Sequence, residues 1–184
     1  MPRTVSERAD TLPALIEVFR EHGYEGTSIS LVSERTGLGK GSLYNFFPGG
    51  KEEMARAALA EIEDWFQHAV FEPLRNSSNP REGVERMFDG VVDYFRSGRY
   101  ACLIGAFALA SSRDRFAPEI ARYFATWRAD LAQALTRKGF NETVSEALSE
   151  ETLAGVQGAL VLTRALDDPN IFLRTITRLR ARLA

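Results

Sequence analysis

Apolar residues recur every three or four positions along almost the whole chain, and this interval corresponds to one face of an α-helix. One clear stripe of this kind consists of Val84, Phe88, Val91 and Phe95. No segment alternates apolar and polar residues over the length of a strand, and no hairpin turn separates two such runs. The spacing therefore predicts an all-α fold with about nine helices.

The composition excludes several kinds of functional centre. Among 184 residues the chain has 23 basic and 25 acidic side chains, and its net charge of −2 excludes a polybasic tail but allows a local basic face. One cysteine, Cys102, and two histidines, His22 and His68, are too few for a disulfide framework or a metal centre. No catalytic or nucleotide-binding motif stands out. We therefore expect no catalytic residue, no metal and no cofactor.

The chain also lacks targeting and membrane signals. Its N-terminus has no apolar core of the kind found in a signal peptide. The longest apolar run, residues 101–110, is about half the length of a membrane span. We therefore expect a soluble, cytoplasmic protein with no membrane partner.

A glycine-punctuated segment, residues 27–47, reads TSISLVSERTGLGKGSLYNFF. Thr27 or Ser28 is suited to cap a first short helix, and a second short helix is expected from about Gly39. Between them Gly37 supplies a left-handed turn conformation at little steric cost. Two short helices joined by such a turn are typical of a helix-turn-helix.

The outer face of the second short helix offers hydrogen-bond donors, a small residue and a phenol, from Lys40, Gly41, Ser42, Tyr44 and Asn45. Such groups suit a DNA groove. From Arg35 to Lys51 there are three basic residues and no acidic one. The helix N-termini at Thr27/Ser28 and at Lys51 offer free backbone N–H groups to phosphates.

Two other interpretations of this segment compete with the helix-turn-helix. The pair of short helices can serve packing alone, without any ligand. A phosphate-binding loop does not fit, because Gly37, Gly39 and Gly41 are spaced G-x-G-x-G rather than G-x-G-x-x-G, and no alternation of strands and helices surrounds them.

The chain resembles the DNA-binding domain of TetR-family transcriptional regulators over roughly residues 6–60. The shared motifs are F-x-x-x-G-Y-x-x-T-S from Phe19 to Ser28, the turn at Gly37, and G-S-L-Y-x-x-F from Gly41 to Phe47. The turn FPGGK, residues 47–51, is similar to that of an LmrA/YxaF-type subgroup.

The resemblance implies a role for each position that matches the motif. Recognition-helix positions that meet DNA would be Lys40, Gly41, Ser42, Tyr44 and Asn45. Phosphate-contact positions would be Thr27, Ser28 and Lys51. The DNA-binding domain would occupy residues 1–50, and a connecting helix from about residue 51 would lead into a ligand-binding and dimerisation domain, residues 51–184. One departure is Pro13, which predicts that the first helix begins near Thr11 or kinks at the proline.

Twelve of the nineteen aromatic residues lie between Trp65 and Trp127. The resemblance implies a ligand pocket among the helices there, and the candidate lining residues are Tyr94, Cys102, Phe107, Tyr123 and Trp127. A plain helical core is the alternative for each of them. Cys102 is in turn either a buried small apolar residue or, beside Arg99, a reactive thiol sensor.

Small and apolar residues near the C-terminus bear on assembly. The family pairs its last two helices across a two-fold axis, and the candidates for that interface are Gly155, Gly158, Phe172, Ile176 and Leu179. Packing within one subunit is the competing explanation. Taken together, the resemblance implies a homodimeric repressor that binds a palindromic double-stranded operator and is released by an unknown small-molecule effector. An enzyme and a helical interaction module are the alternatives from other classes.

Overall fold

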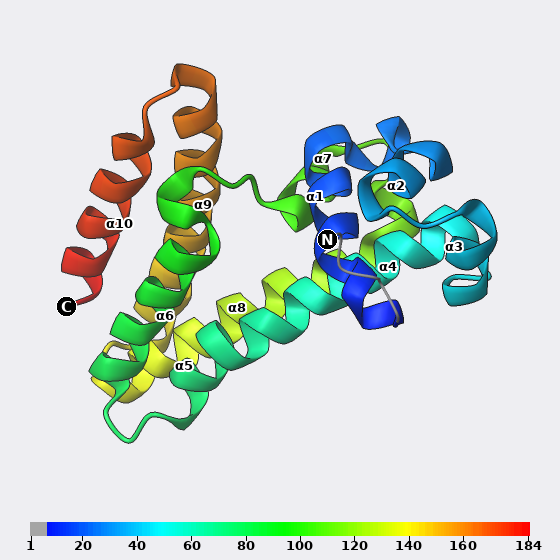
Figure 1. Ribbon diagram of the computed structural model, residues 1–184. Coiled ribbons are helices and arrows are strands. Elements are labelled where there is room, and N and C mark those ends of the chain that lie inside the picture. The colour runs from blue at the N-terminus through cyan, green and yellow to red at the C-terminus, as the bar shows by residue number, and fades with distance from the viewer. Residues whose placement is uncertain (1–6) are drawn as a thin grey trace. The chain divides into compact units, whose positions relative to one another are not determined.

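The computed structural model describes residues 7–184, and this part of the chain is helical without any β-strand (Figure 1). In chain order the elements are α1 (Arg8–Gly26), α2 (Ile29–Thr36), α3 (Lys40–Phe46), α4 (Gly50–Phe66), the π-helical turn η1 (Gln67–Phe71), α5 (Glu72–Asn76), α6 (Pro80–Tyr94), the 3₁₀ turn η2 (Arg96–Gly98), α7 (Leu103–Leu109), the 3₁₀ turn η3 (Arg113–Phe116), α8 (Ala117–Lys138), α9 (Glu142–Leu166) and α10 (Pro169–Leu183). Because α4, η1 and α5 follow one another without a break, residues 7–184 contain nine separate α-helical segments. The all-α prediction is confirmed.

The helices gather into two compact units that are not continuous in sequence. The N-terminal unit contains the described residues up to Glu63 together with Leu103–Ile120, and the C-terminal unit contains Asp64–Cys102 and Ala121–Ala184. Helix α7 therefore packs with α1, although more than seventy residues separate them in the chain.

The core of the N-terminal unit is built from the apolar face of α1. Val18 and Phe19 are fully buried, and the Phe19 ring meets the ring of Phe107 edge-on at 6.2 Å. Next to them the Tyr24 ring lies 5.0 Å from the ring of Phe116. Residues of α7 and η3 thus complete a core that the first three helices begin.

The first helix departs from the expectation for Pro13. Helix α1 begins at Arg8, not near Thr11, and its non-helical backbone lies at Gly23 (φ 66°, ψ 179°) rather than at the proline, so that expectation was wrong. Pro13 has no N–H, so the carbonyl of Ala9, in the first turn of α1, lacks its helical hydrogen bond. The start of the helix is also held locally, since the Thr11 hydroxyl donates to the Arg8 carbonyl at 2.6 Å.

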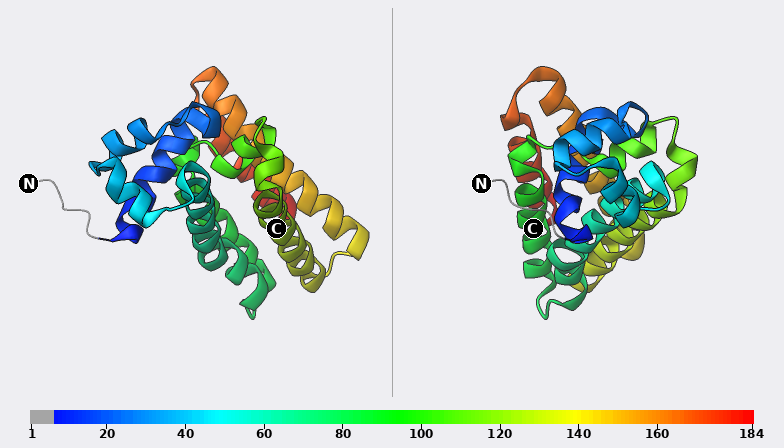
Figure 2. Two further views of the ribbon diagram at one scale, coloured as in Figure 1. Left: turned by 90° about the vertical axis from the view of Figure 1, so that its right-hand side faces the viewer. Right: turned by 45° about the vertical axis from the view of Figure 1, so that its right-hand side comes forward.

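The C-terminal unit has a core of aromatic and aliphatic side chains from α6, α8, α9 and α10. Helices α9 and α10 lie side by side in an antiparallel hairpin, which is visible in Figures 1 and 2. Phe172 of α10 is fully buried, and its backbone N–H donates to the Thr163 hydroxyl of α9 at 3.1 Å. The Thr163 side chain therefore holds the first turn of α10 against α9.

Candidate nucleic-acid interface

The turn between α2 and α3 has the geometry that the glycine pattern predicts. The Ser28 hydroxyl caps α2 by accepting from the Leu31 N–H at 3.2 Å. Gly37 caps the C-terminus of α2 with φ 73° and donates its N–H to the Ser33 carbonyl at 2.9 Å. The Ser33 hydroxyl donates onward to the Leu38 carbonyl at 2.5 Å. These bonds fix the direction in which the chain enters α3, and they confirm the helix-turn-helix.

One side of α3 is held inside the unit and the other faces solvent. Leu43 and, on α2, Val32 are fully buried, so they anchor α3. The remaining polar and small positions of α3 are all exposed, namely Lys40, Gly41, Ser42, Tyr44 and Asn45. Tyr44 is 48% exposed, which is high for a large aromatic side chain. The five residues expected to meet DNA are therefore free to do so.

The charge on this face is modest. Lys40 forms no ion pair with any residue from 7 to 184 that the structure describes, so its ammonium is available to a phosphate or a base edge. Arg35 pairs with Glu21 of α1 at 2.8 Å. Binding through this face therefore depends on a few positioned groups rather than on a broad basic surface.

The three expected phosphate contacts lie in different surroundings. Ser28 is exposed, whereas the Thr27 side chain is 2% exposed and its hydroxyl donates to the Gly23 carbonyl at 2.6 Å. Lys51 donates from Nζ to the Tyr24 carbonyl at 2.9 Å, and Nζ lies 4.4 Å from the centre of the Tyr24 ring. Thr27 thus has a structural role in its own loop, and Lys51 keeps two N–H groups for a further acceptor.

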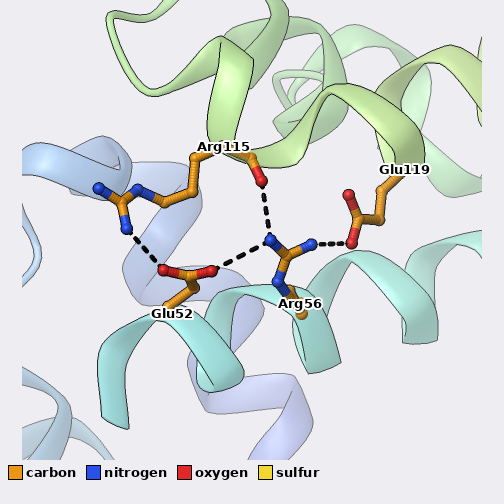
Figure 3. A network of polar contacts seen from close by, with 4 residues as sticks. All are labelled: Glu52, Arg56, Arg115 and Glu119. Carbon is orange, nitrogen blue, oxygen red and sulfur yellow. Dashed lines mark hydrogen bonds and ion pairs between the residues drawn. The ribbon is translucent and has the colours of Figure 1, made fainter. Parts of the chain in front are cut away.

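An ionic network fixes α4 against η3 and the start of α8 within the N-terminal unit (Figure 3). The Glu52 carboxylate accepts from Arg56 at 3.0 Å and from Arg115 at 2.5 Å. Arg56 also donates to the Arg115 carbonyl at 2.8 Å and to the carboxylate of Glu119. The hydrogen bonds from Arg115 and Arg56 lower the pKa of Glu52 below its usual 4.5. No sequence motif signals this network, because its members are brought together only by folding.

Most of the expected pocket residues lie in an aromatic cluster of the C-terminal unit. The Phe66 ring lies 4.8 Å from Tyr94, 5.0 Å from Tyr123 and 5.6 Å from Trp127. Trp127 donates from Nε1 to the sulfur of Met87 at 3.4 Å. Phe107 does not belong to this cluster, since it packs on Phe19 in the N-terminal unit.

Tyr123 is the member of the cluster with a buried polar atom that has no partner among residues 7–184. It is 1% exposed, and its hydroxyl has no hydrogen-bond partner among residues 7–184. Burial raises the pKa of Tyr123 well above its usual range, with smaller contributions from Cys102 and Tyr94 nearby. Cys102 itself is 8% exposed. A buried hydroxyl without a partner costs about 1–3 kcal/mol.

Two families of known proteins match this chain. The family described as bacterial regulatory proteins, tetR family, matches residues 12–58. The family described as transcriptional regulator LmrA/YxaF-like, C-terminal domain, matches residues 80–178, which is more than half of the chain. The chain belongs to the TetR family. The first of these matches contains α2, the turn and α3, so this TetR-family chain is a DNA-binding transcriptional regulator.

Individual known proteins are similar to this chain over most of its length. The HTH-type regulator YxaF of Bacillus subtilis is 26% identical over 160 residues, covering 85% of this chain and 84% of YxaF. A TetR regulator from Legionella pneumophila has a solved structure with a TM-score of 0.82 at 19% identity, covering 99% of this chain and all of that one. A structure of CifR, solved with a 26-base-pair operator DNA, has a TM-score of 0.78 at 22% identity, covering 98% of each chain.

In this TetR-family chain the five residues expected at a dimer interface lie mostly inside one subunit. Phe172 and Ile176 are 0% and 3% exposed. A Cβ atom on Gly155 would lie 3.1 Å from the Leu179 side chain, so these two residues pack α9 on α10. Gly158 differs, because it is exposed and has nothing within 4 Å of the position of a Cβ atom.

Helix α9 also carries exposed apolar side chains that do not belong to this packing against α10. On α9, Val161 is 61% exposed, Leu162 is 51% exposed and Leu166 is 65% exposed. Because α9 also carries buried apolar residues such as Val156 and Leu160, apolar spacing alone does not separate its internal face from its external one.

Two absences concern residues 7–184 only. No helix in this range is both long enough and apolar enough to cross a bilayer. In the same range no three His, Cys, Asp or Glu side chains gather where they could hold a metal ion.

Proposed function

We propose that this chain is a homodimeric repressor that binds a palindromic operator and is released by a small molecule. The observation that carries the proposal is the exposed face of α3, which Leu43 and Val32 hold in place from the buried side. A recognition helix enters the major groove with such a face toward the base edges. Because its target is chromosomal DNA, we also propose that the protein acts in the cytoplasm.

The DNA-reading groups are assigned from chemistry and exposure. Lys40 and Asn45 supply donors to base edges or phosphates, Ser42 and Tyr44 supply hydroxyls, and Gly41 allows the backbone to approach closely. Ser28 and Lys51 are the assigned phosphate contacts, together with the backbone at Thr27. We propose residues 1–50 as the DNA-binding domain and residues 51–184 as the ligand-binding and dimerisation domain, although Leu103–Ile120 of the latter belongs to the same compact unit as the former.

The proposed dimer brings two copies of α3 to the two halves of the operator. The exposed apolar side chains of α9, Val161, Leu162 and Leu166, support an isologous contact around the small residue Gly158. An exposed apolar patch of this kind is typical of a protein interface. The spacing of the two recognition helices would then set the spacing of the half-sites.

Release by the effector is proposed as a shift between two conformations of the dimer. A ligand in the C-terminal domain would favour a conformation whose recognition helices no longer match the half-sites. Helix α4 would carry the change, since it begins in the N-terminal unit and ends in the C-terminal unit.

The test is fluorescence anisotropy with DNA from the region upstream of the gene, competed by a scrambled duplex. We expect salt-sensitive binding with two subunits per site. Lys40→Ala should weaken it and flatten the dependence on salt by about one unit in the log–log slope. Arg86→Ala is the matched control, because Arg86 is an exposed arginine of α6 in the other unit. Equal losses in the two variants would refute the assignment of α3, whereas equal affinity for the scrambled duplex would mean that the operator lies outside this upstream region.

A further inference from the structure

The C-terminal unit contains a pocket of about 380 Å³ between the segment before α7 and the junction of α9 with α10. This volume lies within the range of about 300–1,000 Å³ that is usual for small-molecule sites. One part of its wall is apolar and comes from Ala101, Leu160 and Pro169. The pocket is separate from the aromatic cluster, since none of the rings of that cluster lines it.

Two arginines line the same pocket, and neither is paired with a carboxylate in the described part of the chain. Arg99 and Arg164 are exposed, and neither forms an ion pair or side-chain hydrogen bond with a residue in the range 7–184. Five other arginines of the C-terminal unit do pair with acids, namely Arg75, Arg128, Arg174, Arg180 and Arg182. Two guanidinium groups therefore remain available at one small cavity with apolar walls.

The backbone around the pocket is held in an unusual conformation. Arg96 and Ser97, just before the lining residue Gly98, have φ 45° and 56°, and Asp167, which also lines the pocket, ends α9 as a left-handed C-cap with φ 50°. These are the non-glycine residues with positive φ among residues 7–184. Such conformations cost free energy and tend to occur at functional sites.

The pocket is also rigidly braced from behind. Gly98 has φ 92°, and a Cβ atom there would lie 2.5 Å from the Cβ atom of Phe172. The lining residue Thr163 accepts a hydrogen bond from the Phe172 N–H at 3.1 Å. The wall that carries the arginines is thus fixed to the start of α10 before any ligand arrives.

We infer that this pocket binds a small amphipathic carboxylate, whose anionic end pairs with Arg99 and Arg164. A guanidinium and a carboxylate form two parallel hydrogen bonds, which makes this pairing stronger and more directional than a single contact. With Asp167 included, the charged side chains of the wall sum to one positive charge, which matches a monoanion. The apolar wall then covers the hydrocarbon part. That such a ligand is the effector rests on the proposed function.

The experiment is isothermal titration calorimetry of the full chain with octanoate, with its neutral analogue octanamide, and with inorganic phosphate. We expect octanoate to bind at least tenfold more tightly than either of the others, and added salt to weaken it. Arg164→Gln and Arg99→Gln should each reduce the affinity about tenfold. Arg86→Gln, which removes an exposed charge from α6 of the same unit, should leave it unchanged.

Several results would overturn the inference. If octanamide binds as tightly as octanoate, the negative charge of the ligand does not contribute to binding. If phosphate binds as tightly as octanoate, the apolar wall does not contribute to binding. If Arg164→Gln shifts the molecular mass in light scattering, the pocket is a subunit contact instead. If octanoate binds through both arginines but leaves operator affinity unchanged, the pocket is confirmed and its role in release is refuted. The titration measures binding to the pocket even if no operator is found.

Discussion

Lys51 closes the gap between the first and fourth helices by donating from Nζ to the Tyr24 carbonyl at 2.9 Å. Tyr24 directly follows Gly23, where the regular part of α1 ends, so its carbonyl lies at a helix break. The same ammonium lies 4.4 Å from the centre of the Tyr24 ring, in cation–π geometry. The residue expected to contact a phosphate therefore also joins the two helices that flank the helix-turn-helix.

Replacing Lys51 separates these two roles. We expect Lys51→Gln to lower the free energy of unfolding by about 1 kcal/mol, because a charge-assisted hydrogen bond at a half-buried site is lost. It should also flatten the salt dependence of operator binding by about 0.9 units. Lys40→Gln is the control: it should flatten the salt dependence alone, since Lys40 is exposed. A change in stability without any change in the salt slope would make Lys51 purely structural.

Gly41→Ala should move stability and DNA affinity in opposite directions. Gly41 is an exposed residue in α3 with nothing within 4 Å of the position of a Cβ atom, so alanine fits and favours the helix by up to about 1 kcal/mol. The added methyl group would stand between the backbone and the DNA, so we expect weaker operator binding. Thermal unfolding and anisotropy on the same sample measure the two effects, and unchanged binding would argue against a close approach at Gly41.

Gly37→Ala should lower stability, in contrast to Gly41→Ala. Gly37 also has nothing within 4 Å of the position of a Cβ atom, but its φ is 73°. The cost is therefore conformational and not steric, and we expect the free energy of unfolding to fall by about 1–2 kcal/mol. Gly37→Asn should cost less, because asparagine tolerates the left-handed region. Equal urea-unfolding midpoints for the alanine and asparagine variants would contradict this explanation.

The network around Glu52 predicts a dependence of stability on pH. The pKa of Glu52 is lowered in the folded chain from 4.5 by its hydrogen bonds to Arg115 and Arg56, so folding favours its ionised form. Its contribution is therefore complete above the unfolded pKa and is lost as the pH falls through the folded pKa. We expect Glu52→Gln to be less stable than the parent at neutral pH and to match it in acid.

Urea unfolding at several pH values tests this sign directly. Glu61→Gln serves as the control, because Glu61 is an exposed carboxylate of the same helix. A difference between Glu52→Gln and the parent that persists unchanged below about pH 3 would mean that the ion pairs are not its cause.

Leu162→Glu should convert the proposed dimer into a monomer. Leu162 is 51% exposed on α9, so glutamate is tolerated by the subunit itself and places like charges opposite each other across a two-fold contact. Light scattering should give the mass of one subunit, and operator affinity should fall because only one half-site is bound at a time. Val144→Glu is the control, since Val144 is 39% exposed at the start of the same helix. A dimeric Leu162→Glu would place the interface elsewhere.

Local chemistry was sufficient to predict the helix-turn-helix. The left-handed conformation of Gly37 and the burial of Leu43 follow from residue type and from helical spacing, and both are seen. Pro13 misled the prediction because one missing hydrogen bond early in a helix costs less than the packing of Val18 and Phe19 provides.

Contacts between distant segments could not be predicted in this way. Phe107 looked like a residue of the aromatic pocket, but its partner is Phe19, and no local pattern encodes that pairing. Likewise the spacing of Phe172 and Ile176 fits an internal and an external face of α10 equally well, and only their burial decides between them. The free arginines Arg99 and Arg164 could not be found either, because the absence of a partner is a property of the folded chain.

The place of α7 and η3 in the N-terminal unit matters for anyone who wishes to graft the DNA-reading part onto another protein. A fragment that stops at residue 63 leaves the rings of Phe19 and Tyr24 without the cover of Phe107 and Phe116. The same fragment leaves Glu52 without Arg115 and Arg56 without Glu119. A chimaera that exchanges target sequences therefore has to transfer two separate stretches of the gene. One encodes the chain up to Glu63, and the other encodes Leu103–Ile120, which lies within the proposed ligand-binding domain.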